Sequence, residues 1–271
     1  MSRLLRLLSS LGSGGIPHPD TARNHPLNVV GIVSALAAEA RPLGPTAQRR
    51  GALASLADGT LLAVSGIGAS AAAGGARALI DAGATALISW GMAGGLDPAL
   101  AAGTILLPSE VISCAGTAFM TARYWRERLS AALTAHRLVA CGKLLTSPRA
   151  ILSIADKAAA FRDTGAAAVD MESLAVAEVA GSHELPFIAV RVIVDTAADI
   201  LPRAVMAAAR GSGQLPLGRL LASLARSPGD LAALIRLAPR YRAARHSLLA
   251  VARAGTPARH AFPIVADAAD S

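Results

Sequence analysis

Two acidic segments hold the side chains best suited to acid–base chemistry. Asp170 and Glu172 follow a short apolar run, and Asp195 follows the strand-like stretch 187–194. In an α/β sheet, residues just past the carboxyl ends of strands face the ligand crevice. We therefore expect Glu172 and Asp195 to meet in one pocket. Two carboxyls in one cleft can take different roles if their surroundings separate their pKa values, one ionised and holding hydroxyls, the other protonated and donating.

Helix capping is the simpler interpretation of the first segment. A short helix is expected over 174–181. Acids such as Asp170 and Glu172 at a helix N-terminus accept hydrogen bonds from free N–H groups and favour the helix dipole. For either acid alone, capping would be the better explanation. The order of motifs along the whole chain favours a shared site instead.

Strands and helices alternate along most of the sequence. Strands are expected over 28–34, 61–65, 84–90, 104–108, 138–145 and 187–194, and helices over 69–82, 150–162 and 174–180. This alternation predicts an α/β fold of three layers, with a mixed central sheet flanked by helices. We expect a flexible N-terminal segment over 1–27, a catalytic domain over 28–210, and an Arg-rich helical C-terminal extension over 211–271.

The positive charge is concentrated in the C-terminal extension. The formal net charge is +8, and residues 203–260 contain ten arginines against a single acid, Asp230. The catalytic domain is therefore close to neutral and is not built for polyanions. Leucines at 217, 220, 221 and 224 form a helical stripe, a new helix is expected to start at Pro228 and end at Pro239, and a third helix is expected over 241–253.

This basic extension has two interpretations. Its helices could pack on the sheet domain with their arginines in water. Alternatively, basic amphipathic helices could lie against anionic lipid at the inner face of the cytoplasmic membrane. Apolar stretches are interrupted well before the roughly 18 residues that span a bilayer, and no secretory signal is expected at the N-terminus. We expect a cytoplasmic protein, with peripheral membrane attachment as the second interpretation.

Four motifs in order carry a resemblance to a known family. They are 31–39 (GIVSALAAE), 65–68 (SGIG), 91–96 (GMAGGL) and then the pair of acidic segments. From about Val29 to Leu201 the chain resembles the nucleoside phosphorylase and nucleosidase superfamily, which includes the methylthioadenosine/S-adenosylhomocysteine nucleosidases. It looks most like the hopanoid-associated phosphorylases, which act on adenosylhopane, a nucleoside with a pentacyclic lipid at its 5′ carbon. The Arg-rich extension supports this narrower match.

The resemblance implies a role for each catalytic residue. Asp195 would be the general acid that protonates purine N7, and burial should raise its pKa. Glu172 would accept hydrogen bonds from the ribose hydroxyls, with the backbone of Met171 beneath the sugar. Glu39 would orient and deprotonate the attacking water. Arg191, four residues before Asp195 and on the same face of a regular strand, could hold Glu39 ionised or bind an anion.

The same resemblance suggests further substrate contacts. Glycines in 91–95 would let the backbone approach sugar or base closely. The predicted contacts are the backbone at Ala93 and Gly94, Leu36 and Ile67 at an apolar mouth for the 5′ substituent, and Ile151 or Phe119 beside the base. Segment 65–68 is better explained as a strand-to-helix turn than as a ligand site.

The nucleophile is either water or phosphate. Met92 stands where relatives often have a serine that contacts water or phosphate, and a phosphate site needs several N–H and arginine donors. Only Arg191 and Arg41 lie near the right places. We therefore favour hydrolysis, with inorganic phosphate as the alternative co-substrate and no other cofactor. The histidines and the two cysteines have no metal-ligand spacing, so no metal site is expected.

These observations predict cleavage of the N-glycosidic bond of adenosylhopane, giving adenine and ribosylhopane. The alternative is a methylthioadenosine/S-adenosylhomocysteine nucleosidase, although a small substrate does not require a basic extension. A nucleic-acid-binding protein would need aromatic side chains among the charges, and Tyr241 alone stands there. We expect no specific nucleic-acid partner, and we expect a homo-oligomer.

Overall fold

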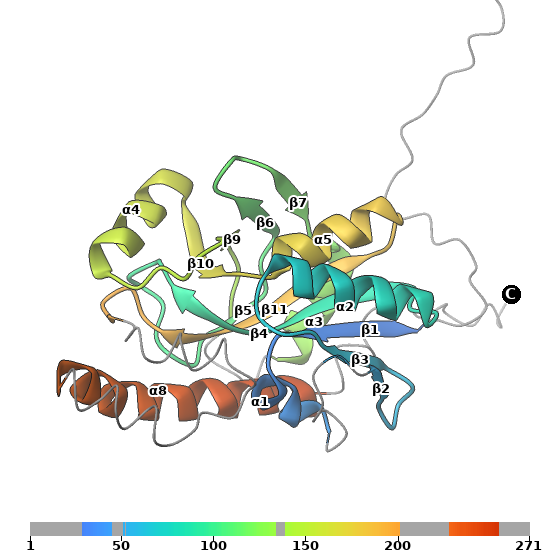
Figure 1. The fold of residues 1–271 in the computed structure, drawn as a ribbon, viewed down its shortest axis with the longest axis horizontal. Coiled ribbons are helices and arrows are strands. Elements are labelled where there is room, and N and C mark those ends of the chain that lie inside the picture. Colours follow the sequence, from blue (N-terminus) through green and yellow to red (C-terminus); the bar gives the residue numbers. More distant parts are fainter. Residues whose placement is uncertain (1–28, 45–50, 52, 134–138, 201–227, 255–271) are drawn as a thin grey trace, which may run out of the picture.

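The protein has a central β-sheet with helices on both faces (Figure 1). The computed structural model describes residues 29–44, 51, 53–133, 139–200 and 228–254. The predicted N-terminal segment and the leucine stripe at 217–224 lie outside these residues. The domain boundaries therefore stay predictions.

The sheet is mixed, as predicted. Its strands are β1 (Val30–Ser34), β2 (Leu53–Ser55), β3 (Leu61–Val64), β4 (Ala86–Gly95), β5 (Ile105–Leu106), β6 (Glu110–Ser113), β7 (Ala118–Met120), β8 (Val139–Ala140), β9 (Lys143–Thr146), β10 (Ala166–Asp170) and β11 (Phe187–Asp195). The main path runs β2-β3-β1-β4-β10-β9-β6-β7, and β11 joins β4 to β5. Strand β4 is parallel to β1 and β11 but antiparallel to β10.

Helices cover both faces of this sheet and confirm the three-layer fold. They are α1 (Ala37–Ala40), the short 3₁₀ helix η1 (Arg41–Leu43), α2 (Ala69–Asp81), α3 (Arg123–Ala132), α4 (Ile154–Thr164), α5 (Ser173–Ser182) and α8 (Pro228–Arg253). Helices α2 and α5 lie side by side on one face, and α8 runs along the other (Figure 1).

Alternation along the central strands divides the core between the two faces. In β1, Ile32 packs in a cluster with Leu248 of α8, whereas Val33 packs in a second cluster with Leu79 of α2. This period of two is the pattern of a strand buried on both sides. Full burial of a side chain such as Leu248 stabilises the fold by about 1.5–3 kcal/mol.

The C-terminal extension differs from its prediction. The expected helix start at Pro228 is confirmed, but Pro239 does not end the helix, and α8 continues through it to Arg253. Proline weakens a helix interior because it lacks an N–H and crowds the preceding turn. Packing outweighs this penalty, since Ala244, Leu248 and other side chains of the same helix are completely buried on the domain.

Candidate active site

The site forms where β4 changes its neighbour. Strand β1 pairs with β4 up to Trp90, and β10 takes over from Gly94 on the same side. Strand β11 pairs with the other edge of β4 throughout, from Leu87 to Gly94. The edge of β4 between Trp90 and Gly94 is therefore free to meet side chains from the segments that follow β1 and β10. It is a topological switch point of the kind where ligands bind in open α/β sheets.

Glu39 occupies this edge of β4. Its Oε1 accepts a hydrogen bond of 3.0 Å from the N–H of Met92, and its carbonyl oxygen accepts one of 2.8 Å from Trp90 Nε1. A Cβ added to Gly91 would lie 2.9 Å from Oε2, so glycine is what leaves space for the carboxyl. Burial raises the pKa of Glu39 to about 7, and the nearby charge of Glu172 adds to the increase.

Glu172 approaches the same edge from the end of β10. Its Oε1 accepts from the Gly68 N–H at 2.8 Å, and its Oε2 accepts from the Met171 N–H at 3.2 Å. Burial and the neighbouring Asp170 raise the pKa of this carboxyl, while Arg191 opposes the increase. Because Glu172 is only half-buried, a bound molecule could still reach it. The predicted turn 65–68 thus positions Glu172 through a backbone donor.

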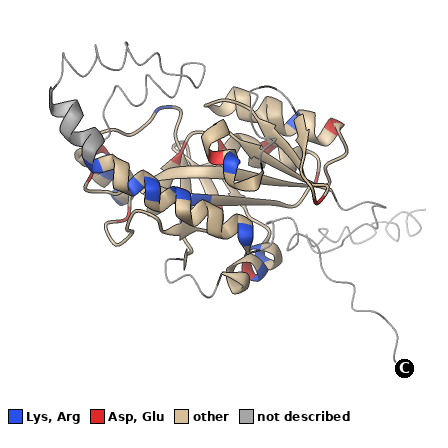
Figure 2. Cartoon of the chain, turned by 90° about the horizontal axis from the view of Figure 1, so that it is seen from below, with Lys and Arg blue, Asp and Glu red and all other residues tan. Residues whose placement is uncertain are grey.

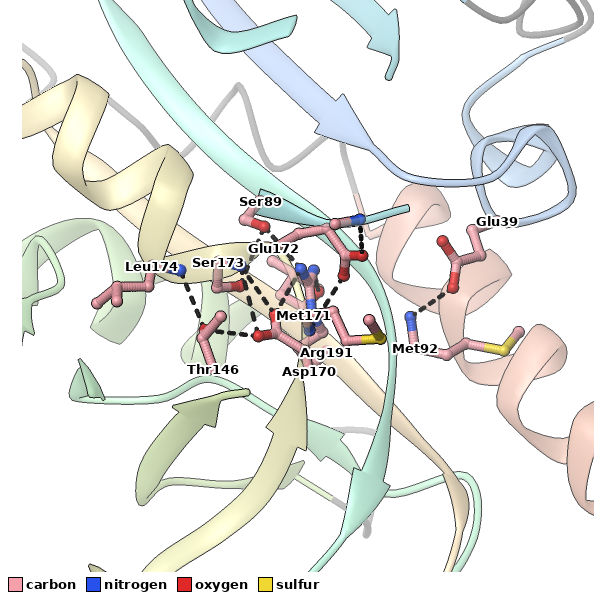
Figure 3. A network of polar contacts seen from close by, with 12 residues as sticks. Glu39, Ser89, Met92, Thr146, Asp170, Met171, Glu172, Ser173, Leu174 and Arg191 are labelled. Carbon is pink, nitrogen blue, oxygen red and sulfur yellow. Dashed lines mark hydrogen bonds and ion pairs between the residues drawn. The ribbon is translucent and has the colours of Figure 1, made fainter. Parts of the chain in front are cut away.

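Capping of α5 belongs to Asp170 and not to Glu172. Both carboxylate oxygens of Asp170 accept from the Ser173 N–H, at 3.2 and 3.4 Å, and Thr146 Oγ1 donates to Oδ1 at 2.6 Å. Figure 3 shows this buried network, with Glu172 beside it. Glu172 occupies the N-cap position but makes no side-chain cap hydrogen bond. The capping interpretation was therefore right for one acid of the pair, and the other is left for different contacts.

Arg191 is a member of this buried network and not an anion site. Its Nε donates to Asp170 Oδ2 at 2.9 Å, and its second terminal nitrogen donates to Ser89 Oγ at 2.6 Å. The remaining terminal nitrogen donates to the Val190 carbonyl at 3.1 Å. Because these partners use the guanidinium, anion binding by Arg191 loses its donors, whereas its predicted role in holding Glu39 ionised stays a prediction. It lowers the pKa of Glu39 only by its charge.

Asp195 lies across β4 from Glu172. The pairing of β11 with β4 shifts between Ile193 and Asp195, which sets Asp195 beside Gly94. This irregularity breaks the regular alternation on which the predicted shared face with Arg191 depended. A Cβ on Gly94 would lie 3.3 Å from Oδ2, so this glycine again leaves space for a carboxyl. Gly94 also pairs with Val169 of β10, three residues before Glu172.

Lys157 is the important residue that sequence reasoning missed. Its side chain is completely buried and forms an ion pair with Asp195 Oδ2. Burial raises the pKa of Asp195, and the Lys157 ammonium opposes that increase. Helix α4 carries Lys157 and begins at the Ser153 cap, whose Oγ accepts from the Asp156 N–H at 3.0 Å. A lysine in the first turn opposes the helix dipole, and this was the available signal.

The predicted substrate contacts lie on different parts of the fold. The methyl of Ala93 packs in the core beneath α2 and α5, and the space over Gly94 holds Asp195, so the predicted contact of a ligand with their backbone stays a prediction. Half-buried positions are found for the remaining four, Leu36, Ile67, Ile151 and Met171. Their roles stay predictions.

Phe119 packs at the end of α5 that is far from Glu172. Its ring packs over Gly181, where a Cβ would lie 3.2 Å from a ring carbon. Gly181 and Glu172 are at opposite ends of α5, roughly 13 Å apart along the helix axis. Ile151 instead packs against a cluster that contains Val169, next to Gly94.

The comparison with protein families decides the assignment. The profile described as Phosphorylase superfamily matches residues 29–214, more than half of the chain. The protein belongs to the phosphorylase superfamily. As a member of this superfamily it is an enzyme, and the broad resemblance found in the sequence motifs is confirmed. A sequence search of curated proteins found no match.

Solved structures with this phosphorylase-superfamily fold include nucleosidases and a related hydrolase. The 5′-methylthioadenosine/S-adenosylhomocysteine nucleosidase from Neisseria meningitidis is 19% identical, with a TM-score of 0.60 over 83% of this chain and 98% of that one. A mutant Helicobacter pylori MTAN with 5′-methylthioadenosine in its active site is 17% identical, with a TM-score of 0.58 over 74% and 99%. Futalosine hydrolase from Helicobacter pylori is 18% identical, with a TM-score of 0.58 over 73% and 97%. At these identities the likeness shows the fold.

The site of this phosphorylase-superfamily enzyme groups three carboxyls, those of Glu39, Glu172 and Asp195. Within the described residues, no group of three or more His, Cys, Asp and Glu side chains could hold a metal ion. The cysteines Cys114 and Cys141 are both exposed and form no disulfide. None of the helices described is long and apolar enough to cross a membrane. The chemistry that this arrangement can support is proton transfer between buried carboxyls and a bound molecule.

Proposed function

We propose that the protein cleaves the N-glycosidic bond of an adenine nucleoside, with water as the nucleophile. The observation that carries this proposal is the grouping of Glu39, Glu172 and Asp195 around one short stretch of β4. Each carboxyl has different partners, so each can hold a different protonation state. Strands β10 and β11 flank β4, which puts their backbones roughly 10 Å apart. A nucleoside can span this separation.

Each carboxyl then takes one part of the reaction. Asp195 gives its proton to purine N7 as the C1′–N9 bond breaks and its electrons pass to the base. Glu172 accepts hydrogen bonds from the 2′- and 3′-hydroxyls, which strengthen as the sugar becomes cationic. Glu39 takes a proton from the water whose oxygen adds to C1′. A general base with a pKa of about 7 is well matched to this step near neutral pH.

The use of Arg191 favours water over phosphate. A phosphate dianion needs several N–H and guanidinium donors, but every nitrogen of the Arg191 guanidinium donates to protein acceptors. Arg41 lies on η1 and is exposed, so it is not a second buried donor for a phosphate. Glu39 beside Met92 is in contrast suited to a water molecule. Phosphorolysis is the alternative, and reactions with and without phosphate distinguish the two.

The substrate that we propose is adenosylhopane. Leu36 lies three residues before Glu39, and Ile67 is next to Gly68, whose N–H donates to Glu172. Both side chains are apolar and half-buried, which suits contact with an apolar 5′ substituent. Helix α8 packs against η1, and η1 directly follows α1, the helix that carries Glu39. The basic helix is therefore next to the site, where a lipid-bearing nucleoside would arrive from a membrane surface.

The membrane surface itself is a proposed partner. Arginines are spread along α8 (Figure 2), and those at 236, 242, 245 and 253 are exposed. The apolar side of the helix is buried on the domain through Ala244, Leu248 and Val251. Attachment would therefore be electrostatic, between arginines and anionic lipid headgroups, without insertion of the helix. We propose that the enzyme works in the cytoplasm, at the inner face of the cytoplasmic membrane.

A smaller substrate is the second candidate. The chemistry would be the same on methylthioadenosine or S-adenosylhomocysteine, the substrates named for several proteins of this fold. The two candidates differ only in the size and polarity of the 5′ group.

The test is incubation of the enzyme with adenosylhopane or methylthioadenosine, with and without phosphate, followed by mass analysis of both products. We expect adenine and ribosylhopane without phosphate, and slower cleavage of methylthioadenosine. The variant Asp195→Asn should lose at least about 100-fold in kcat, because general-acid catalysis contributes 10²–10⁴-fold. Glu172→Gln should also lower kcat, because a neutral amide accepts weaker hydrogen bonds from the hydroxyls of a cationic sugar than a carboxylate does. A phosphorylated sugar formed only with phosphate would replace hydrolysis by phosphorolysis. Unchanged turnover in either variant would refute the residue assignment.

A further inference from the structure

The ion pair behind Asp195 is the most unusual feature outside the proposed chemistry. Lys157 Nζ donates to Asp195 Oδ2, to the Thr196 carbonyl at 2.7 Å and to the Asp199 carbonyl at 3.1 Å. An ammonium has three donors, and all three are used. The Lys157 side chain has no exposed surface, and that of Asp195 is 4% exposed.

Stability of the fold gives little reason for the buried ion pair of Lys157 and Asp195. Placing two charges in a protein interior carries a desolvation penalty that their attraction often does not exceed, and apolar side chains of similar size commonly serve stability as well. The contacts of Lys157 are all directed at Asp195 and at the loop that follows it. This arrangement indicates that the charge of Lys157 acts on the carboxyl of Asp195.

We infer that Lys157 is a positioning residue for the general acid Asp195. It holds Oδ2, so that Oδ1 is the oxygen available to the base, and it provides the positive charge that balances the carboxylate formed when the proton leaves. The inference rests on the proposed function. No proton leaves Lys157 in this step: the O–H bond of Asp195 breaks, an N–H bond forms at the base, and the ammonium remains charged.

The charge balance explains why a cation is useful there. Burial alone raises the pKa of Asp195 and would make it a weak acid that keeps its proton. Lys157 opposes that effect, and so does Arg240 of α8, while Asp199 adds to it. Arg240 pairs with Asp199 Oδ1 and so offsets that second carboxylate. A general acid works best when its pKa lies near the operating pH.

The test compares Lys157→Met with Lys143→Met, the same substitution at an exposed lysine that pairs with Glu110. Two substrates are used: the adenine nucleoside cleaved by the wild type, and p-nitrophenyl riboside, whose leaving group needs no proton. Lys157→Met should lower kcat on the adenine nucleoside about 100-fold and change p-nitrophenyl riboside less than about 5-fold, in keeping with the loss of general-acid catalysis. Lys143→Met should change neither.

The pH profile separates this role from a structural one. Without the ammonium, Asp195 should keep its proton to higher pH. The alkaline limb of the kcat profile should therefore move to higher pH in Lys157→Met. It should stay in place in Lys157→Arg, which keeps the charge. Lys157→Gln, a polar replacement without charge, is measured beside Lys157→Met in case the latter does not fold, and its alkaline limb should also move upward. In an Asp195→Asn background, Lys157→Met should cause no further loss, because Lys157 acts through the carboxyl.

Several results would overturn the inference. These are equal losses on the two substrates, an alkaline limb that stays in place without the charge, or a further loss in the Asp195→Asn background. Failure of the wild type to cleave either nucleoside would instead refute the proposed function, on which the inference rests.

Discussion

The three carboxyls of the site differ in what holds them. Glu39 accepts from the Met92 N–H of β4, Glu172 accepts from the N–H groups of Gly68 and Met171, and Asp195 accepts from the ammonium of Lys157. Burial is the largest cause of a raised pKa at each of them. Similar side chains are thus given separate tasks by the charges and donors around them.

A bell-shaped pH dependence is expected from two of these carboxyls. Glu39 must be ionised to accept a proton from water, so kcat/KM should fall as the pH drops below about 7, the value to which burial raises its pKa. Asp195 must be protonated to donate, so activity should also fall at high pH. Initial rates between pH 5 and about 10 test this. Glu39→Gln should be nearly inactive, and an acid limb that persists in its residual rate would assign that limb to another group.

Strand β4 is the element that brings the carboxyls together. Its segment from Gly91 to Gly95 continues as a strand, although the sequence suggested that the strand ends at Trp90. The glycines have a structural role besides the ligand contact predicted for them. At Gly91 and Gly94 the missing side chains make room for the carboxyls of Glu39 and Asp195.

Gly91→Ala tests this role of β4. The added methyl would lie 2.9 Å from Glu39 Oε2 and 3.1 Å from the carboxyl carbon, so the carboxyl must move. We expect kcat/KM to fall about 100-fold, the size of effect that a displacement of 1 Å can have on catalysis. The control is Gly74→Ala on α2, where the added Cβ meets nothing within 4 Å. Activity close to wild type in Gly91→Ala would show that the Glu39 carboxyl is not held in a required position.

At the scale of the whole molecule, α8 joins the basic extension to the catalytic domain. Ser247 Oγ donates to the Gly103 carbonyl at 2.7 Å, and the buried side of the helix includes Leu248 and Val251. Deletion of α8 would therefore expose core side chains and would not isolate the effect of charge. Substitution of its exposed arginines is the sharper experiment.

We expect the triple variant Arg242→Gln, Arg245→Gln and Arg253→Gln to bind anionic vesicles about 100-fold more weakly than the wild type. Each arginine near such a surface contributes about 1 kcal/mol, and about 1.4 kcal/mol corresponds to a factor of ten. Vesicle sedimentation with phosphatidylglycerol measures the difference, and neutral phosphatidylcholine vesicles are the control. Cleavage of methylthioadenosine should be unchanged. Equal binding of both proteins to anionic vesicles would mean that this face of α8 only meets water.

Local patterns of residues were enough to predict the superfamily, the α/β class and most of the central strands and helices. The hydrophobic periodicity of a segment reports whether it forms a helix or a strand, and this holds for most segments in the folded chain. Strands β2 and β10, the hairpin of β6 and β7, and helix α3 were missed, although Trp125 and Leu129 of α3, one helical turn apart, are both buried. The continuation of α8 through Pro239 was also missed, because packing on the sheet outweighs the local preference.

The pairing of the buried charges could be seen only in the folded chain. Its spacing predicted that Arg191 shares a strand face with Asp195, but the guanidinium pairs with Asp170 of β10, on the other side of β4. Lys157 is 38 residues from Asp195 along the chain, so no spacing rule could join them. Pairing of this kind depends on how strands are ordered in a sheet and on a shift of register in β11, and neither is written in the local pattern of residues.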